Sequence, residues 1–444
     1  MSIKQSVFEQ ITLESNDFQR TIDITPGVTE VRYYEDLFSP TITATIRVVS
    51  TAGAIVGRES KDTQRQSVYH GLPLVGGERV ALKIASNSTT NPGLDFLTSP
   101  KDYLYVSSIS NAIIENNKES FTLNLVSREA IANETTRVSK KYSFPTIDQS
   151  VSSILSSVLK TEKQLTIDKT SNKYNFIGNM RKPFTVLTWL ASKSVPESSG
   201  SPTAGFFFYQ TKDGFNFRSI DALLNKEKNP PRYAYYYNES NESYTVDGKK
   251  VDNDFKILNY NIERNQNLIE KLRLGTYASH RMFFNPLTFN FTRPEDGVFK
   301  KDDYITKVEN LGKQEFKLPI LAEGSDKTLG DVPTRIITAV YDVGTLEVGV
   351  STAINSDQTQ YQSQSLMRYN NLFTHMLNVM IPSNTNLKAG DVIECYFPKI
   401  TRSDAREYDE EQSGLYMIKE ICHYFDATRS YTSLKLIRDT YGVR

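Results

Sequence analysis

The chain has 444 residues, with 52 basic and 52 acidic side chains that balance to a formal net charge of +0. This length suffices for about three domains, and the balanced charge excludes a global electrostatic attraction to nucleic acid or to a lipid surface. No segment approaches the roughly 20 apolar residues of a membrane span, and the N-terminus lacks a charged region followed by an apolar one. We therefore expect no stable membrane association and no secretion through a signal peptide.

The first 130 residues have the pattern of strands separated by turns. Residues 42–49 and 121–126 alternate between apolar and polar side chains, and residues 76–84 begin at a Gly-Gly turn and continue as an extended run. Such alternation is typical of strands with one buried face. It predicts a first tube-like β-barrel domain over residues 1–130.

Residues 131–228 combine helical and strand signals. Apolar residues recur at helical spacing over 146–160, where Asp148 is placed to cap the helix or to complement its dipole. A second helix is expected to begin at Pro183, because the first helical turn has no partner for the N–H that proline lacks. This helix carries Trp189, the only tryptophan of the chain.

A β-hairpin is predicted after that helix. The aromatic residues 206–209 and the alternating Phe215 and Phe217 flank Asp213-Gly214, which supplies the positive φ of a tight turn. Helices and hairpin together indicate a small α+β module inserted between β-rich regions. We expect Trp189 and residues 206–208 to form its local core.

The second half returns to extended patterns. Residues 229–335 are predicted to be a mixed β region in which the tyrosines 235–237 belong to a strand, and the charged, turn-rich segment 295–330 indicates an insertion or interdomain loop. Residues 336–444 contain a helical period at 365–376 and then alternate to the end. They predict a second tube-like β-barrel domain.

The two ends of the chain resemble each other in order, spacing and a terminal Arg-acid pair. Three segments of the first end match three of the second, namely 76–80 with 389–393, 104–106 with 415–417 and 121–129 with 431–439. A duplicated barrel explains this match, and chance similarity of amphipathic strands is the alternative. Three copies with two similar barrels each would place six near-equivalent barrels in a ring, so we hypothesise a homotrimer.

The sequence lacks the spaced motifs that are typical of common catalytic and metal-binding sites. The chain has no zinc-protease, phosphate-loop, nucleophile-elbow or EF-hand spacing. Its histidines are scattered at positions 70, 280, 375 and 423, and His423 and its neighbour Cys422 should point to opposite faces of a strand. The acidic pair 302–303 and the acidic run 407–411 have the pattern of solvated loops. We therefore assign no catalytic, cofactor-binding or metal-binding residue and expect no enzymatic activity.

Cysteines and aromatic residues have ordinary structural explanations. Cys395 and Cys422 are too few for a disulfide framework and lie in apolar strand-like runs, which predicts small buried thiols and fits assembly in a reducing cytoplasm. Aromatic-rich strands could form a stacking platform for carbohydrate or single-stranded nucleic acid, but rings that alternate at strand period favour a core or a subunit interface.

Several segments resemble the central hub subunit of baseplates in contractile-tailed (myovirus) bacteriophages, and this family is related to the hub portion of type VI secretion spike proteins. The resemblance is most specific in the inserted module and the last hairpin, at residues 174–184, 189–193, 205–219, 414–425 and 435–439. It implies a mainly β fold with two tube-like barrels per chain. It also implies a trimeric virion protein of the tail baseplate that is assembled in the host cytoplasm.

The resemblance further implies a structural role. Such a hub joins the tail tube or a tube-initiator protein to the central membrane-piercing spike, contacts wedge proteins and the tape measure, and lets the genome DNA pass through its channel without specific binding. The sequence ends soon after the last hairpin, with neither a lysozyme-like domain nor a β-helix, so the spike is expected to be a separate chain. The alternatives are another baseplate or receptor-binding protein, or an envelope-degrading tail enzyme.

Overall fold

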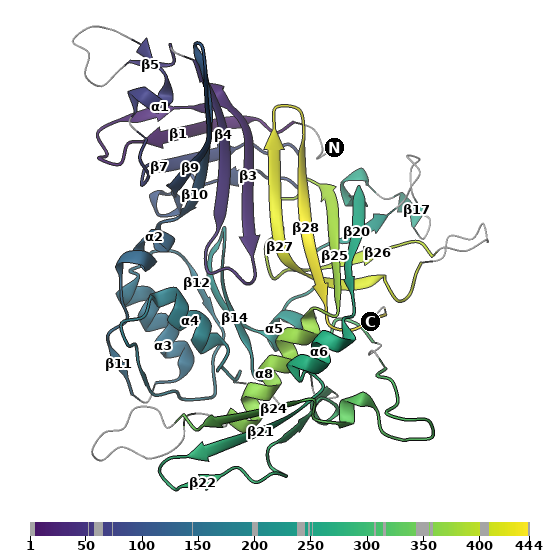
Figure 1. Ribbon diagram of the computed structural model, residues 1–444. Helices are drawn as coiled ribbons and strands as arrows, with labels where there is room; N and C mark the ends of the chain where they lie inside the picture. The colour runs from purple at the N-terminus through teal and green to yellow at the C-terminus, as the bar shows by residue number, and fades with distance from the viewer. Residues whose placement is uncertain are drawn as a thin grey trace.

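The computed structural model describes residues 5–51, 53–56, 65–72, 74–143, 145–197, 203–237, 245–246, 249–250, 252–305, 308–313, 317–342, 355, 358–399 and 408–442. Strands dominate, as the sequence predicts, and most of them belong to one large sheet that crosses the molecule (Figure 1). The mainly β fold class is thereby confirmed.

The first repeat forms one end of this sheet. Its neighbouring strands follow the order β3-β4-β10-β9-β7-β1-β2. Their bounds are β1 (Phe8–Glu14), β2 (Thr21–Asp23), β3 (Val28–Asp36), β4 (Thr43–Thr51), β7 (Arg79–Ile84), β9 (Leu104–Glu115) and β10 (Lys118–Ser127), with the short β5 (Ile55–Val56), β6 (Arg65–Gln66), α1 (Val68–Gly71) and β8 (Leu94–Asp95) beside them.

The second repeat has the same connectivity. Strands β20, β25, β28, β27 and β26 pair in that order, which matches β3, β4, β10, β9 and β7 one for one. Their bounds are β20 (Asn259–Asn265), β25 (His375–Pro382), β26 (Val392–Tyr396), β27 (Gly414–Asp426) and β28 (Ser430–Arg438), and β16 (Ala234–Tyr237) and β19 (Lys256–Ile257) extend the β26 side.

A shared turn supports duplication over chance. In the first repeat Gly77 N donates to Val106 O at 2.8 Å and Val106 N donates to Glu78 O at 2.9 Å. In the second repeat Gly390 N donates to Ile418 O at 2.8 Å and Ile418 N donates to Asp391 O at 2.9 Å. Both glycines have positive φ, +87° and +85°, which side chains with a Cβ rarely adopt.

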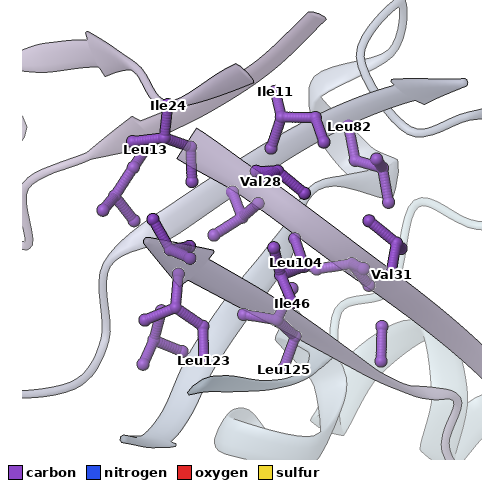
Figure 2. Packing of buried hydrophobic residues seen from close by; sticks show 14 of the residues in the cluster. Ile11, Leu13, Ile24, Val28, Val31, Ile46, Leu82, Leu104, Leu123 and Leu125 are labelled. Atoms are coloured by element: carbon purple, nitrogen blue, oxygen red, sulfur yellow. The ribbon is translucent and has the colours of Figure 1, made fainter. Parts of the chain in front are cut away.

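Each repeat buries one face of its strands. In the first, apolar side chains from β1, β3, β4, β7, β9 and β10 interdigitate, as Figure 2 shows for Ile11, Val31, Ile46, Leu82 and Leu123. The second repeat has its own cluster, which includes Tyr235, Leu377, Ile393, Ile421 and Leu434. Two separate cores fit two domains.

The two repeats are joined edge to edge. β27 pairs with β28 on one side and, from Glu420 to Asp426, with β3 on the other, so the strands lie side by side across the junction (Figure 1). Strands β16, β19 and β20 pair with the second repeat although they lie within residues 229–335. The division at 1–130, 131–228, 229–335 and 336–444 stays a proposal, and these pairings favour assigning strands β16, β19 and β20 to the second repeat.

The inserted module contains the expected helices and hairpin. α3 (Ile147–Ser153) continues into the π-helical turn η3 (Ile154–Val158), α4 begins at its proline (Pro183–Ala191), and β14 (Phe206–Thr211) pairs with β15 (Gly214–Ser219). The remaining elements are α2 (Arg128–Thr135), β11 (Lys141–Tyr142), β12 (Leu165–Ile167), β13 (Phe176–Ile177) and α5 (Ile220–Leu224).

Local contacts differ in detail from the capping that the sequence suggests. The N-cap of α3 is Thr146, whose N–H donates to Gln149 Oε1, while Asp148 Oδ1 accepts from the Thr170 hydroxyl at 2.7 Å. Gly214 has φ +133°, and a Cβ there would lie 2.2 Å from Gln164 O. The hairpin glycine is therefore required both by the turn and by the close approach of the segment before β12.

Trp189 is only partly buried, which corrects the expectation that it forms the centre of the module core. Its ring packs edge-on against Tyr174 and Phe176 at 5.3 and 5.6 Å between centroids, while Phe217 is 0% exposed. We expect Trp189→Ala to lower the free energy of unfolding by about 2 kcal/mol and Phe217→Ala by about 3–5 kcal/mol. Chemical denaturation followed by far-UV circular dichroism measures both, and a larger loss for Trp189 would contradict this ranking.

A smaller sheet and a long helix complete the fold. β21 (Ala278–Asn285) pairs with β22 (Asn290–Phe291), β23 (Val298–Lys300) and β24 (Arg335–Val340), and α8 (Gln358–Leu372) lies next to this sheet, longer than the predicted 365–376 period (Figure 1). Helix α6 (Leu268–Leu274) lies within residues 229–335, where the prediction of a mixed β region included no helix. The segment 295–330 includes β23, α7 (Asp302–Ile305) and a 3-10 turn (Leu329–Asp331).

Candidate functional site

The main candidate is the open face of the large sheet, defined here as the side of β20, β25, β28, β27, β3, β4, β10 and β9 that faces away from the two cores. Short polar side chains cover much of it. Asn124 Nδ2, for example, donates to the hydroxyls of Ser108 and Ser110 at 3.1 Å. Other members are Asn261, Asn378, Ser433, Cys422, Tyr34, Thr45, Ser120 and Thr122.

Charges on the open face neutralise one another. On β3, β4, β27 and β28, Arg32, Arg47, Lys419 and Lys435 are matched by Glu30, Asp36, Glu420 and Asp426. Ion pairs connect them, among them Arg32–Glu30 at 2.6 Å, Lys435–Glu420 at 2.9 Å and Lys419–Asp36 at 3.2 Å. A surface of this kind has little net attraction for a polyanion.

One end of this face is covered. Met417 and Ile437 pack there against Phe207 of the hairpin and Leu223 of α5, and Tyr369 and Phe373 from α8 and its end lie beside them. The inserted module and α8 are therefore fixed to the sheet by an apolar contact. The uncovered part of the open face lies beyond this contact.

Two strands of the large sheet, β9 and β20, have an unpaired edge. Beyond Val106, the edge of β9 that faces away from β10 has no strand partner among the described residues, and the same holds for the edge of β20 that faces away from β25. Ile113, Ile114 and Ile262 on these strands are 53%, 62% and 37% exposed. Free edges with exposed isoleucines are prone to pair with another chain, because proteins usually protect such edges with charge.

The two free edges have counterparts inside the chain. β9 corresponds to β27, and β20 corresponds to β3, in the strand order of the two repeats. Within the chain, the end of β27 that extends past β26 pairs with β3 in antiparallel fashion. The free edges of β9 and β20 are therefore the counterparts of two edges that pair with each other in this chain.

A buried carboxylate fixes the junction of both repeats and the module. Glu35 on β3 is 1% exposed and accepts from Lys212 N at 2.6 Å, Ala389 N at 2.9 Å and the Tyr33 hydroxyl at 2.9 Å. Burial raises the pKa of Glu35 to about 7, although these donors oppose the shift. One side chain thereby links β3, the hairpin turn and the second-repeat turn.

The titratable residues singled out from the sequence are dispersed. His375 and His423 are buried in different parts of the second repeat, and His280 lies on β21. His423 is 0% exposed while Cys422 is half-buried, so the two side chains point to opposite faces as expected. Cys395 is buried. Within the described ranges, no group of three His, Cys, Asp or Glu side chains is placed to hold a metal ion.

Two predicted groups fall partly outside the described residues. Glu407 is not described, and of His70 only the backbone position in α1 is given. Asp302 and Asp303 are exposed at the start of α7, as expected for solvated carboxylates. Most aromatic rings on the long strands are buried, whereas Phe289 and Phe291 beside β21 are 78% and 69% exposed.

Comparisons with known proteins give a consistent result. No protein-family model matches the chain. It is 22% identical over 299 residues to a Vibrio phage KVP40 protein named "Probable baseplate hub protein gp334", and the match spans 66% of this chain and 66% of that protein. The chain resembles a baseplate hub protein. The resemblance stated from the sequence is thereby confirmed.

Solved structures show the same fold. The 43 kDa tail protein of prophage MuSo2 from Shewanella oneidensis superposes with a TM-score of 0.51 at 8% identity, over 98% of this chain and all of that one. A tail protein from Neisseria meningitidis MC58 gives a TM-score of 0.52 at 9% identity, over 97% and 96%. The chain has the fold of these tail proteins.

Sequence reasoning missed the surfaces that matter most. The open face and the two edges depend on strand pairing between residues about 390 positions apart, which no local pattern encodes. The cap signals of α6 were present, since Asn267 accepts from Glu270 N and Gly275 ends the helix at φ +69°, but the aromatic run around them favoured strands. No helix among the described residues has the length and apolarity needed to cross a membrane.

Proposed function

We propose that this protein is a structural hub of a contractile phage tail baseplate and that it works as a homotrimeric ring. The observation that carries the proposal is the sheet of two repeats whose unused edges match the junction already present inside the chain. Three chains joined through β9 and β20 would form a closed ring of six similar units. Such a ring adapts a sixfold tail tube to a threefold spike.

In this proposal the open face lines the channel. Its Ser, Thr and Asn side chains and its paired charges offer no strong positive field, so genome DNA would pass without being retained by phosphate contacts. The inserted module and the small sheet with its exposed Phe289 and Phe291 are left for contacts to other baseplate proteins, including a separate spike. The hub acts mechanically, and we expect no enzymatic activity.

Electron microscopy of the purified full-length chain tests this proposal. We expect a threefold ring with six peripheral lobes and a central channel lined by β3, β4, β27 and β28. A ring with another face inside, or a chain at the rim of the baseplate rather than on its axis, would contradict it. Peptidoglycan release clearly above buffer would favour the enzyme alternative.

A further inference from the structure

A basic hollow lies where the hairpin, the linker after α5 and the turn before β26 meet. It has a volume of about 320 Å³. Its lining includes four cations and one carboxylate, Arg218, Lys228, Arg232, Lys388 and Asp391. Nothing in the proposed ring or channel uses this hollow.

Aspartate carboxylates contact three of these cations but do not contact all of the N–H groups that the cations carry. Arg218 Nε contacts Asp168 at 3.1 Å, Arg232 Nε contacts Asp391 at 3.4 Å, and Lys388 Nζ contacts Asp213 at 2.7 Å. The terminal amino groups of both arginines and the ammonium of Lys228 have no partner among the described residues. The site therefore keeps free, oriented donors.

A tyrosine hydroxyl belongs to the lining as well. Tyr209 lines the hollow, and its side chain is only 3% exposed. A hydroxyl at this place can donate to a carboxylate oxygen. Close approach of Gly390 preserves the space, because a Cβ at Gly390 would lie 2.6 Å from the Tyr209 oxygen.

We infer that this hollow binds carboxylate side chains of an acidic polypeptide segment. Arginine forks match carboxylates in two-point geometry, and the lining has more cations than anions. A phosphate dianion would meet stronger repulsion from Asp391, and a single phosphate would leave much of the hollow unfilled. Leu223, Pro230 and Pro231 offer apolar contact to the stems of glutamate or aspartate.

Fluorescence anisotropy with labelled hexaglutamate and hexaglutamine tests the inference on the full-length chain at roughly 50 mM salt, where surface charges are weakly screened. We expect hexaglutamate to bind the wild-type chain at least about tenfold more tightly than hexaglutamine does. The double variant Arg218→Gln/Arg232→Gln should bind hexaglutamate at least about tenfold more weakly than the wild type. Lys228→Gln, which breaks no ion pair among the described residues, should give a smaller loss without affecting thermal unfolding.

Arg47→Gln is the matched control, because Arg47 is an exposed arginine on the open face outside the hollow. Equal loss of affinity in this control would assign peptide binding to general surface charge and overturn the inference. Equal affinity for both peptides would also overturn it. Inorganic phosphate that binds the wild-type chain when hexaglutamate does not would make the hollow a small-anion site instead.

Discussion

Ile113→Lys/Ile114→Lys on β9 should convert the proposed trimer into monomers. These isoleucines are 53% and 62% exposed in the single chain, on the strand edge proposed to pair with β20 of the next copy. Losing the burial of these exposed fractions would remove about 2–3.5 kcal/mol from each junction, or roughly 30- to 400-fold in affinity. The added lysines also protect the edge against pairing.

Sedimentation at micromolar concentration measures this change. The wild-type chain should sediment as a species about three times its 50.4 kDa mass, and the double variant as a single chain. Ile320→Lys is the control, because Ile320 is 57% exposed but lies on neither edge strand. A wild-type chain that stays monomeric would count against the ring itself, whereas a trimeric double variant would move the interface elsewhere.

Acid should destabilise the chain through two buried histidines. Burial lowers the pKa of His375 to about 4 and that of His423 to about 3, with Arg438 near His375 and Lys212 near His423 adding to the shift. Both histidines are neutral in the folded state, but each gains a proton below about pH 6.5 when the chain unfolds. The free energy of unfolding that depends on their neutral form is therefore fully present above pH 6.5 and is lost as the pH falls. At pH 5 each should contribute about 2 kcal/mol of destabilisation.

Variants separate this effect from that of Glu35, which has the opposite sign. The pKa of Glu35 is raised to about 7, so the folded state holds its proton more tightly and stability from this group increases as the pH falls from about 7 to 4.5. Between pH 7 and 5, His423→Gln should lose less stability than the wild type, and Glu35→Gln should lose more. Denaturant titrations at both pH values measure this, and identical pH slopes in all three chains would refute the assignment.

Local sequence patterns predict the helices, the hairpin and the repeat. The open face and the free strand edges depend instead on pairing between strands that are far apart in the sequence. Pro183, the 146–160 periodicity and Asp213-Gly214 each specify their structure within a few residues, which is why those predictions hold. The half-burial of Trp189 depends on Tyr174 and Phe176, which come from another segment of the module. No pattern around the tryptophan indicates how much of it neighbouring segments cover.

The repeat could be found in the sequence because turn chemistry is local. The Gly-Glu and Gly-Asp turns at 77–78 and 390–391 make the same hydrogen bonds, so their similarity has a structural cause. Neither the covered end of the open face nor the basic hollow could be predicted in this way. Both arise where the inserted module packs on the second repeat, and Glu35 and Tyr209 gain their surroundings only there.

The pairing of β3 with β27 also constrains how the chain folds during synthesis. Arg32 and Tyr424 are register partners, so the first repeat must wait for roughly 390 further residues before one of its edges is completed. Until then β3 of a nascent chain is an open edge with the pairing geometry of the finished junction. Neighbouring chains on one messenger RNA are therefore at risk of exchanging strands until β27 has emerged from the ribosome.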